Sequence, residues 1–325
     1  MSKKSSYCCI RPECGRIFLI QDSDGLHCHS GHFFPFSPDS NVPIFASEPE
    51  GSNEYSQTNA AEVNDNALRW VFSTFQDDEA SLRQRLIDRL GLKAGNRVLV
   101  TGAGAGNDLP YVAKALSGVG EIFAQDIAKE MLLTGVTRYQ NQLSGTEIQL
   151  EFSVSDATQL PFSDNYFDAA YHFGGINLFP DIAKGILEMN RVVKHGGVVV
   201  IGDEGLAPWL RESEYGKMLI ANNTLYAYSP PLSLLPITAR SVELTWELSN
   251  CFYVIKFNVS EEALSINLDV PHLGTRGGSI RSRYFGQLEG VDPKLRDSIY
   301  AEAERKKLTR VEYIESALRA KLDAE

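Results

Sequence analysis

The chain has 325 residues, 43% of them hydrophobic, and a formal net charge of -11 at pH 7. This length is enough for one sizeable α/β domain with an attached module. The acidic balance makes nucleic acid an unlikely partner, because no basic run opposes it. No apolar stretch is long enough for a signal peptide or a membrane span, which predicts a cytoplasmic protein.

Four of the five cysteines fall within the first 28 residues. In a reducing compartment, such clustering favours a metal site over disulfides. The pattern C-x4-C-x13-C-x3-H can bring three thiolates and one imidazole to a tetrahedral zinc. The predicted ligands are Cys9, Cys14, Cys28 and His32. Cys8 competes with Cys9 for one position, His27 or His29 could replace a ligand, and a metal-free ribbon with buried cysteines is the alternative.

Residues 1–48 form a unit too short and too polar to fold without such a metal, so we expect a zinc-ribbon-like module. Residues 49–63 are polar and contain proline, glycine and serine, which predicts a linker. Helical spacing then predicts two helices before residue 90. The apolar positions are Leu68, Val71, Phe72 and Phe75, followed by Leu82, Leu86 and Leu90.

A glycine-rich stretch follows at residues 98–108. Val98 to Val100 has the β-branched, apolar character of a buried parallel strand, and residues 109–116 switch to helical spacing. The alternating glycines between them permit positive φ and let a ligand approach the backbone. This pattern predicts a nucleotide-binding loop, and a glycine turn in an unrelated α/β protein is the alternative.

The chain then alternates strands and helices. We expect strands over residues 121–126, 148–154, 166–173 and 198–201, with helices over 128–139 and 181–193. Residues 242–248 and 252–259 predict an antiparallel hairpin. These elements indicate a doubly wound parallel α/β sheet that ends in the hairpin. Residues 261–325 are expected to be an extension, in which Thr309 and Glu312 form the capping box of a final helix.

Residues 64–260 resemble class I S-adenosylmethionine-dependent methyltransferases, in particular the methyltransferase type 11 group that includes ubiquinone and menaquinone biosynthesis enzymes. The resemblance rests on VLVTGAGAGND, FAQD, SDATQLPFSDNYFD and EMNRVVKHGG followed by VVVIGDE, in this order. It implies the Rossmann-like sheet of that class, S-adenosylmethionine as the cofactor, and methyl transfer as the activity.

The resemblance also implies roles for single residues. Asp126 would bind the ribose hydroxyls, and its position about twenty residues after the glycine loop suits that contact. Asp156 would accept from the adenine amine. Val100 stands where the family usually carries an acid, so Asp108 is the candidate for the methionine ammonium, and a lost cofactor site is the alternative. The implied cofactor-binding residues are Thr101, Gly102, Ala103, Gly104, Gly106, Asp108, Asp126, Ile127, Asp156, Ala157, His172 and Phe173.

Methyl transfer from a sulfonium is an in-line displacement, in which the protein mainly aligns the nucleophile and excludes water. A hydroxyl or carbon acid would also benefit from a general base. His172, Asp203 and Glu204 lie at the predicted carboxyl ends of strands, where a base belongs. His172 is the first candidate because histidine titrates near neutrality. It could equally shape the adenine pocket, while Asp203 and Glu204 could be a helix cap and a solvated acid.

The first module resembles two zinc modules found beside methyltransferases. One is the amino-terminal module of bacterial large-subunit rRNA guanine-N1 methyltransferases, and the other is the small zinc subunit that activates some tRNA and protein methyltransferases. The likeness lies in C-x3-H followed by F-P and V-P-I-F. Its aromatic tail, residues 33–36 and 44–45, exceeds what so small a core can bury. We therefore expect the tail to pack on the methyltransferase domain, where it could close a wall of the acceptor pocket, or on a second subunit.

Residues 206–240 occupy the place of the family's substrate-binding insert. Their aromatic residues favour a planar or apolar small molecule, although core packing would also explain them. The basic, glycine-rich residues 272–284 could form a lid that grips an anionic group, or simply a turn with solvated arginines. The zinc module and the extension at 261–325 are the candidate homodimer contacts.

Three functions stay open. The first is a small-molecule methyltransferase, favoured by the acidic charge and the aromatic insert. The second is an RNA methyltransferase, suggested by the zinc module but opposed by the charge and by HFGGIN where N-P-P-Y or D-P-P-Y would stand. The third is a non-catalytic cofactor-binding or partner-activating protein.

Overall fold

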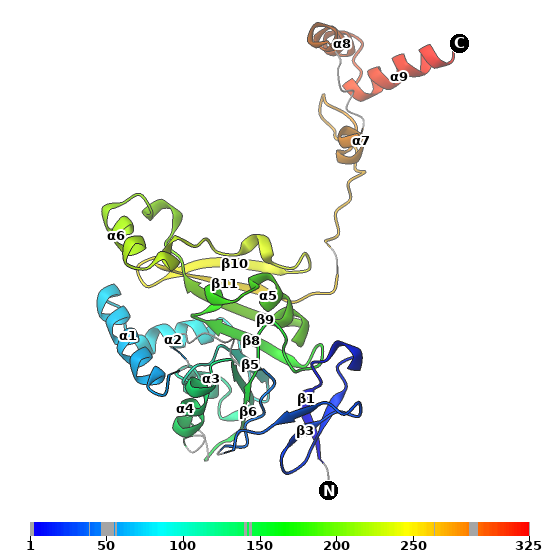
Figure 1. Cartoon of the computed structure of the whole chain (residues 1–325). Helices are drawn as coiled ribbons and strands as arrows, with labels where there is room; N and C mark the ends of the chain where they lie inside the picture. Colours follow the sequence, from blue (N-terminus) through cyan, green and yellow to red (C-terminus); the bar gives the residue numbers. More distant parts are fainter. Residues whose placement is uncertain are drawn as a thin grey trace. The chain divides into compact units, whose positions relative to one another are not determined.

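The computed structural model describes residues 3–38, 40–46, 55, 57–139, 142, 145–262, 264–285 and 292–324. By its internal contacts the chain divides into two compact units, Met1–Glu262 and Ala263–Glu325 (Figure 1). Residues 49–54 and 56 of the expected linker lie outside the described residues. No described helix is long and apolar enough to cross a membrane.

A seven-stranded sheet forms the centre of the first unit, with the strand order β10-β11-β9-β8-β5-β6-β7. The strands β5 to β9 pair in parallel, whereas β11 runs antiparallel to both β9 and β10. The predicted parallel sheet with a terminal antiparallel hairpin is therefore confirmed. The strands are β5 (Arg97–Thr101), β6 (Val119–Asp126), β7 (Glu147–Val154), β8 (Phe167–Phe173), β9 (Val193–Glu204), β10 (Arg240–Glu247) and β11 (Phe252–Asn258).

Helices connect these strands close to their predicted positions. The two helices expected before residue 90 are present, but the first begins at Ala60, within the predicted linker. The side chain of Asp181 accepts a hydrogen bond from the Lys184 backbone N–H at 2.9 Å and fixes the start of α5. The helices are α1 (Ala60–Phe75), α2 (Glu79–Asp88), α3 (Leu109–Ala115), α4 (Lys129–Tyr139), α5 (Ile182–Val192) and, in the insert, α6 (Glu214–Asn222).

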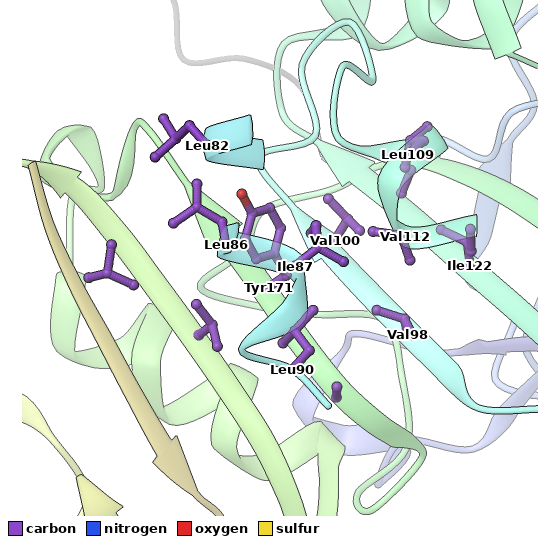
Figure 2. Close-up of a cluster of buried hydrophobic side chains, with 14 of the residues drawn as sticks. Leu82, Leu86, Ile87, Leu90, Val98, Val100, Leu109, Val112, Ile122 and Tyr171 are labelled. Atoms are coloured by element: carbon purple, nitrogen blue, oxygen red, sulfur yellow. The ribbon is translucent and has the colours of Figure 1, made fainter. Parts of the chain in front are cut away.

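Apolar side chains fill the space between the sheet and helices α2 and α3, as Figure 2 shows. Val98 and Val100 of β5 face this cluster, whereas Leu99 between them belongs to a second cluster on the opposite face. All three are nearly inaccessible to solvent. Burial on both faces explains why the strand reads as a continuous apolar run. The labelled residues of Figure 2 are Leu82, Leu86, Ile87, Leu90, Val98, Val100, Leu109, Val112, Ile122 and Tyr171.

A second, four-stranded antiparallel sheet forms the N-terminal module, in the order β1-β2-β3-β4. Its strands are β1 (Lys3–Cys8), β2 (Phe18–Gln21), β3 (Gly25–His27) and β4 (Phe33–Pro35). Ile44, just after the module's sheet, pairs in parallel with Val154 at the end of edge strand β7. The Tyr7 ring packs on Phe45, and also on Phe123 and Phe162 of the large domain.

The module therefore packs on the methyltransferase-like sheet, as its aromatic tail predicted. Further contacts join Cys8 N to Pro161 O at 2.8 Å, and Gln159 Nε2 to Ile10 O at 2.8 Å. These described contacts lie at strand β7 and the loop that follows it. They do not include the insert at 206–240, and a role of the module as a wall of the acceptor pocket stays a prediction.

The second unit contains three helices among its described residues: α7 (Ile280–Phe285), α8 (Pro293–Arg305) and α9 (Arg310–Leu322). The predicted capping box of α9 is present, with Thr309 N donating to Glu312 Oε2 at 2.8 Å. Helices α7 and α8 were not predicted. Residues 272–278 form a turn, and Arg281 pairs with Asp269 at 2.7 Å. These contacts agree with the turn alternative for the basic segment.

Candidate cofactor and metal sites

The glycine loop connects β5 to α3 and needs glycine for steric reasons. Gly102, Gly104 and Gly106 all have positive φ, at +59°, +52° and +83°. A Cβ on Gly102 would lie 2.7 Å from the His172 ring, and one on Gly106 would lie 2.8 Å from the Tyr139 ring. The loop is thus a tight backbone cradle at the carboxyl end of the sheet, where ligands bind in such folds.

Asp126, the last residue of β6, holds this loop. Its Oδ2 accepts from Gly104 N at 2.7 Å, and its Oδ1 accepts from Ala128 N at 2.8 Å. The Ala103 N–H donates to the Gln125 carbonyl at 2.9 Å, which ties the loop to β6 a second time. A carboxylate has about four acceptor sites, so backbone N–H groups and the hydroxyls of a ligand can share it.

Asp156 lies on the loop after β7, beside the end of β6. Parallel pairing aligns Asp126 with Val154, and Ser155 N donates to the Asp126 carbonyl at 3.0 Å. The Asp156 Oδ1 accepts from Thr158 N at 2.7 Å, while Ala157 is buried. Two of the predicted cofactor acids are therefore brought to one edge of the sheet.

His172 lies beneath the glycine loop, near the end of β8. Its Nδ1 is 3.0 Å from the Thr101 carbonyl oxygen, which can only accept, so Nδ1 carries the hydrogen and Nε2 the lone pair. Burial lowers the pKa of this imidazole, since only 1% of it is exposed. Among the described residues, Nε2 has no hydrogen-bond partner. Phe173, the next residue, stacks on Phe252 at a centroid distance of 5.9 Å.

Asp108 is engaged in an ion pair. Its Oδ1 lies 2.7 Å from Arg83 of α2, and Arg83 also pairs with Glu79 at 2.8 Å. Burial by itself would lower the pKa of Arg83. The negative charges of Asp108 and Glu79 outweigh this effect, so the pKa is raised. Val100 is buried in the apolar cluster of Figure 2, so an acid at that position would lose its hydration. The position where the family usually carries an acid is thus occupied by Val100, whose side chain packs in an apolar cluster with residues of α2.

Asp203 and Glu204 end β9 and belong to a polar network. Asp203 is fully buried, and its two oxygens accept from Asn177 N at 2.7 Å and from Glu204 N at 2.8 Å. The Asn177 side chain donates to the Glu204 carbonyl at 2.7 Å and accepts from the Tyr253 hydroxyl at 3.1 Å. Sequence reasoning missed Asn177 and Tyr253, because they are 76 positions apart in the chain.

The insert covers this end of the sheet with aromatic side chains. Leu206 N donates to the Tyr226 carbonyl at 2.8 Å, which folds the insert back on β9. Trp209, 64% exposed, meets Trp246 of β10 edge to face at 5.2 Å. The Trp246 indole donates to the Gly205 carbonyl at 3.2 Å. Exposed aromatic surface thus lies next to the strand end that carries Glu204.

The four predicted metal ligands converge in the module. Their ligand atoms, from Cys9, Cys14, Cys28 and His32, all lie within 4.8 Å of one another. The His32 Nδ1 is 3.6, 3.3 and 3.2 Å from the Sγ atoms of Cys9, Cys14 and Cys28. The Sγ atoms of Cys14 and Cys28 are 3.8 Å apart. A tetrahedral zinc with bonds of about 2.0 to 2.3 Å needs separations of about 3.5 to 3.8 Å, so the residues fit this ion.

A carboxylate supports the histidine of this cluster. Glu13 Oε1 lies 3.2 Å from His32 Nε2, the ring nitrogen that faces away from the thiols. Acids in this position commonly orient a metal-binding imidazole. Sequence spacing gave no signal for Glu13. Cys8, His27 and His29 are not among the four residues whose ligand atoms meet, and His27 pairs with Asp22 at 2.5 Å.

Residues 99–201 match a protein family described as a methyltransferase domain. This segment carries the glycine loop, Asp126, Asp156 and His172 on the parallel strands β5 to β9. The chain contains a methyltransferase domain.

The methyltransferase domain is similar to the demethylmenaquinone methyltransferase of Staphylococcus aureus, with 31% identity over 118 residues. That match covers 36% of this chain and 47% of the relative, so the chain spans about half the length of the curated relatives it matches. Phosphoethanolamine N-methyltransferase 2 of Haemonchus contortus, solved with S-adenosylmethionine, is 14% identical with a TM-score of 0.51. The match covers 75% of this chain and 71% of the other chain, and it is a similarity of fold.

Proposed function

We propose that the chain is an S-adenosylmethionine-dependent methyltransferase that acts on a small molecule. The observation that carries this proposal is the position of Asp126, whose carboxylate is fixed by Gly104 N and Ala128 N beside three positive-φ glycines. A carboxylate so placed is suited to accept from two vicinal ribose hydroxyls. The similarity of residues 99–201 to methyltransferase domains supports the same cofactor.

Each predicted residue then has a role toward the cofactor. The backbone of the glycine loop approaches the methionine and ribose parts, because no side chain intervenes. Asp126 accepts from the ribose hydroxyls, and Asp156 accepts from the adenine amine beside the buried Ala157. Ile127 and Phe173, both half-buried, line the apolar sides. When bound, the cofactor supplies a methyl group on a sulfonium, and the protein aligns the acceptor and excludes water.

His172 serves as a structural part of this site rather than as a general base. Its Nδ1 donates a hydrogen bond to the Thr101 carbonyl. Its ring packs edge to face on Phe179, with the ring centroids 5.1 Å apart. A base must reach the proton that it removes, which a ring enclosed in this way does not do. Asp108 is the remaining acid near the methionine end, and its pairing with Arg83 makes Arg83 part of that end of the site.

The acceptor is proposed to be an aromatic or otherwise apolar small molecule. The exposed Trp209, Tyr215 and Met218 of the insert offer such a molecule a binding surface. The similarity to a protein named demethylmenaquinone methyltransferase makes demethylmenaquinone the first candidate to test. The net charge of -11 opposes an RNA acceptor.

We further propose that Cys9, Cys14, Cys28 and His32 bind one zinc ion with a structural role. All four donors are protein side chains, which is typical of closed structural sites. Such an ion would stabilise a module whose own apolar core is small. Elemental analysis of the protein purified without chelator should find one zinc per chain, and its absence would contradict the assignment.

Methyl transfer itself can be tested by mass spectrometry with S-adenosylmethionine labelled with 13C in the methyl group. Reduced demethylmenaquinone, phosphoethanolamine and RNA should be offered separately as acceptors. We expect the label in the quinol and none in RNA. Release of S-adenosylhomocysteine with RNA alone would favour the RNA alternative, and no release with any acceptor would favour a non-catalytic protein.

A further inference from the structure

Two consecutive carboxyl groups lie at the buried end of β9, and their environments differ. Asp203 has no exposed surface, and backbone N–H groups occupy both of its oxygens at 2.7 and 2.8 Å. Glu204 is only half-buried. Among the described residues, no lysine or arginine forms an ion pair with either acid. The pair therefore has one member fixed inside the protein and one whose side chain is partly exposed.

Two neighbouring carboxylates at low solvent exposure resist ionising together, because like charges repel strongly where water is scarce. The two N–H donors stabilise the ionised form of Asp203. The proton then remains on Glu204. In agreement, burial, followed by a side-chain hydrogen bond with Asp203 and the charge of Asp203, raises the pKa of Glu204 to about 9.

The other titratable groups around this pair are neutral at physiological pH. His172 approaches Asp203 from β8, and burial lowers the pKa of its ring. Tyr226 from the insert and Tyr253 from β11 lie near Glu204, and burial raises the pKa of both hydroxyls. None of them supplies a positive charge that would ionise Glu204. The acid also borders the aromatic insert, where the acceptor is proposed to bind.

We propose that Asp203 and Glu204 hold one proton between them and that Glu204 presents it, as a hydrogen-bond donor, to an oxygen of the methyl acceptor. This inference rests on the function proposed above. It restricts the acceptor to molecules with a hydroxyl, phenolate or carbonyl oxygen near the methylated atom. It also makes Glu204 a hydrogen-bond donor in the site, rather than the base considered from the sequence, and makes Asp203 a positioning residue that keeps Glu204 protonated.

The test measures binding of 2,3-dimethyl-1,4-naphthoquinone to the full chain by quenching of tryptophan fluorescence. This probe has two carbonyl oxygens, and both free carbons of its quinone ring are already methylated. The wild type should bind the probe with constant affinity near neutrality. Its affinity should fall about tenfold as pH rises through about 9, because Glu204 ionises there. Glu204→Gln keeps a neutral donor and should bind independently of pH, whereas Glu204→Leu should bind about tenfold more weakly at every pH.

Two further variants make the test specific. Asp203→Asn removes the neighbouring charge and should move the pH midpoint downward by about one unit or more. Glu243→Gln alters an exposed acid of β10, paired with Lys256 at 3.1 Å, and should behave as the wild type. The proposal fails if the wild type does not bind the probe, if its affinity is constant through pH 9, or if Glu204→Gln binds as weakly as Glu204→Leu. Because the probe needs no methyl transfer, these outcomes are separable from failure of the proposed function.

Discussion

Gly102 is required by a neighbouring side chain as well as by its backbone conformation. A methyl group there would lie 2.7 Å from the His172 ring, at a φ of +59°. Gly91 has nearly the same φ, +60°, but nothing within 4 Å of its Cβ position. We predict that Gly102→Ala lowers the free energy of unfolding by about 2 to 4 kcal/mol, against about 1 kcal/mol for Gly91→Ala. Urea denaturation measures both, and equal losses would contradict the contact with His172.

Glu204 should make the stability of the protein depend on pH. Its pKa is about 9 when folded and about 4.5 when unfolded, so the folded state binds more protons between these values. The free energy of unfolding should therefore fall as pH rises through this window. Relative to Glu204→Gln, we predict that the wild type loses about 1 to 3 kcal/mol between pH 5 and pH 9. Parallel stability curves for the two proteins would show that Glu204 is not a buried neutral acid.

The sequence predicted residues within one motif better than residues that meet across the fold. The four predicted metal ligands lie within 23 positions of each other in sequence, and the fold brings their ligand atoms together, whereas spacing alone left the choice between Cys8 and Cys9 open. Arg83 contacts Asp108 across 25 positions, and Asn177 contacts Tyr253 across 76. No local pattern marks such pairs, because the sheet order brings them together.

At the scale of elements, the short 3-10 helix Pro12–Cys14 positions the acid beside the proposed metal site. Glu13 bonds to His32 Nε2 at 3.2 Å and fixes the orientation of the ring. We predict that Glu13→Gln weakens zinc binding roughly tenfold, measured by competition with a chromophoric chelator. Asp22→Asn, which alters the acid beside the non-ligand His27, is the matched control and should leave zinc affinity unchanged. Equal affinities in the two variants would exclude a supporting role for Glu13.

Strands and helices of the central sheet could be predicted because burial imposes a clear apolar period on them. Helices α7 and α8 could not, since α8 is largely exposed and has one buried residue, Ala303. The docking position of the module was also beyond prediction. Its aromatic tail predicted a buried contact, but only the fold shows that Phe45 N donates to Val154 O at the β7 edge.

At the scale of the whole molecule, the module supports the loop that carries Asp156. Contacts from Cys8, Ile10 and Phe45 hold residues 154–161. A chain beginning at residue 50 should therefore melt at a lower temperature and bind S-adenosylmethionine roughly tenfold more weakly. Gln159→Ala, which removes one of these bonds, should show a smaller loss of affinity. A truncated protein with full thermal stability and full cofactor affinity would refute this supporting role.

Calorimetric titration of the full chain with S-adenosylmethionine tests cofactor binding at the glycine loop most directly. The wild type should bind one equivalent, and Asp126→Ala should lose roughly 1.5 to 3 kcal/mol of binding free energy through lost charge-assisted hydrogen bonds. Glu121→Ala, on the same strand but paired with Arg97 at 2.7 Å, should keep the wild-type affinity. Thermal melts confirm that each variant is folded. Absence of binding by the wild type, or unchanged affinity in a folded Asp126→Ala variant, would contradict the assignment of this site.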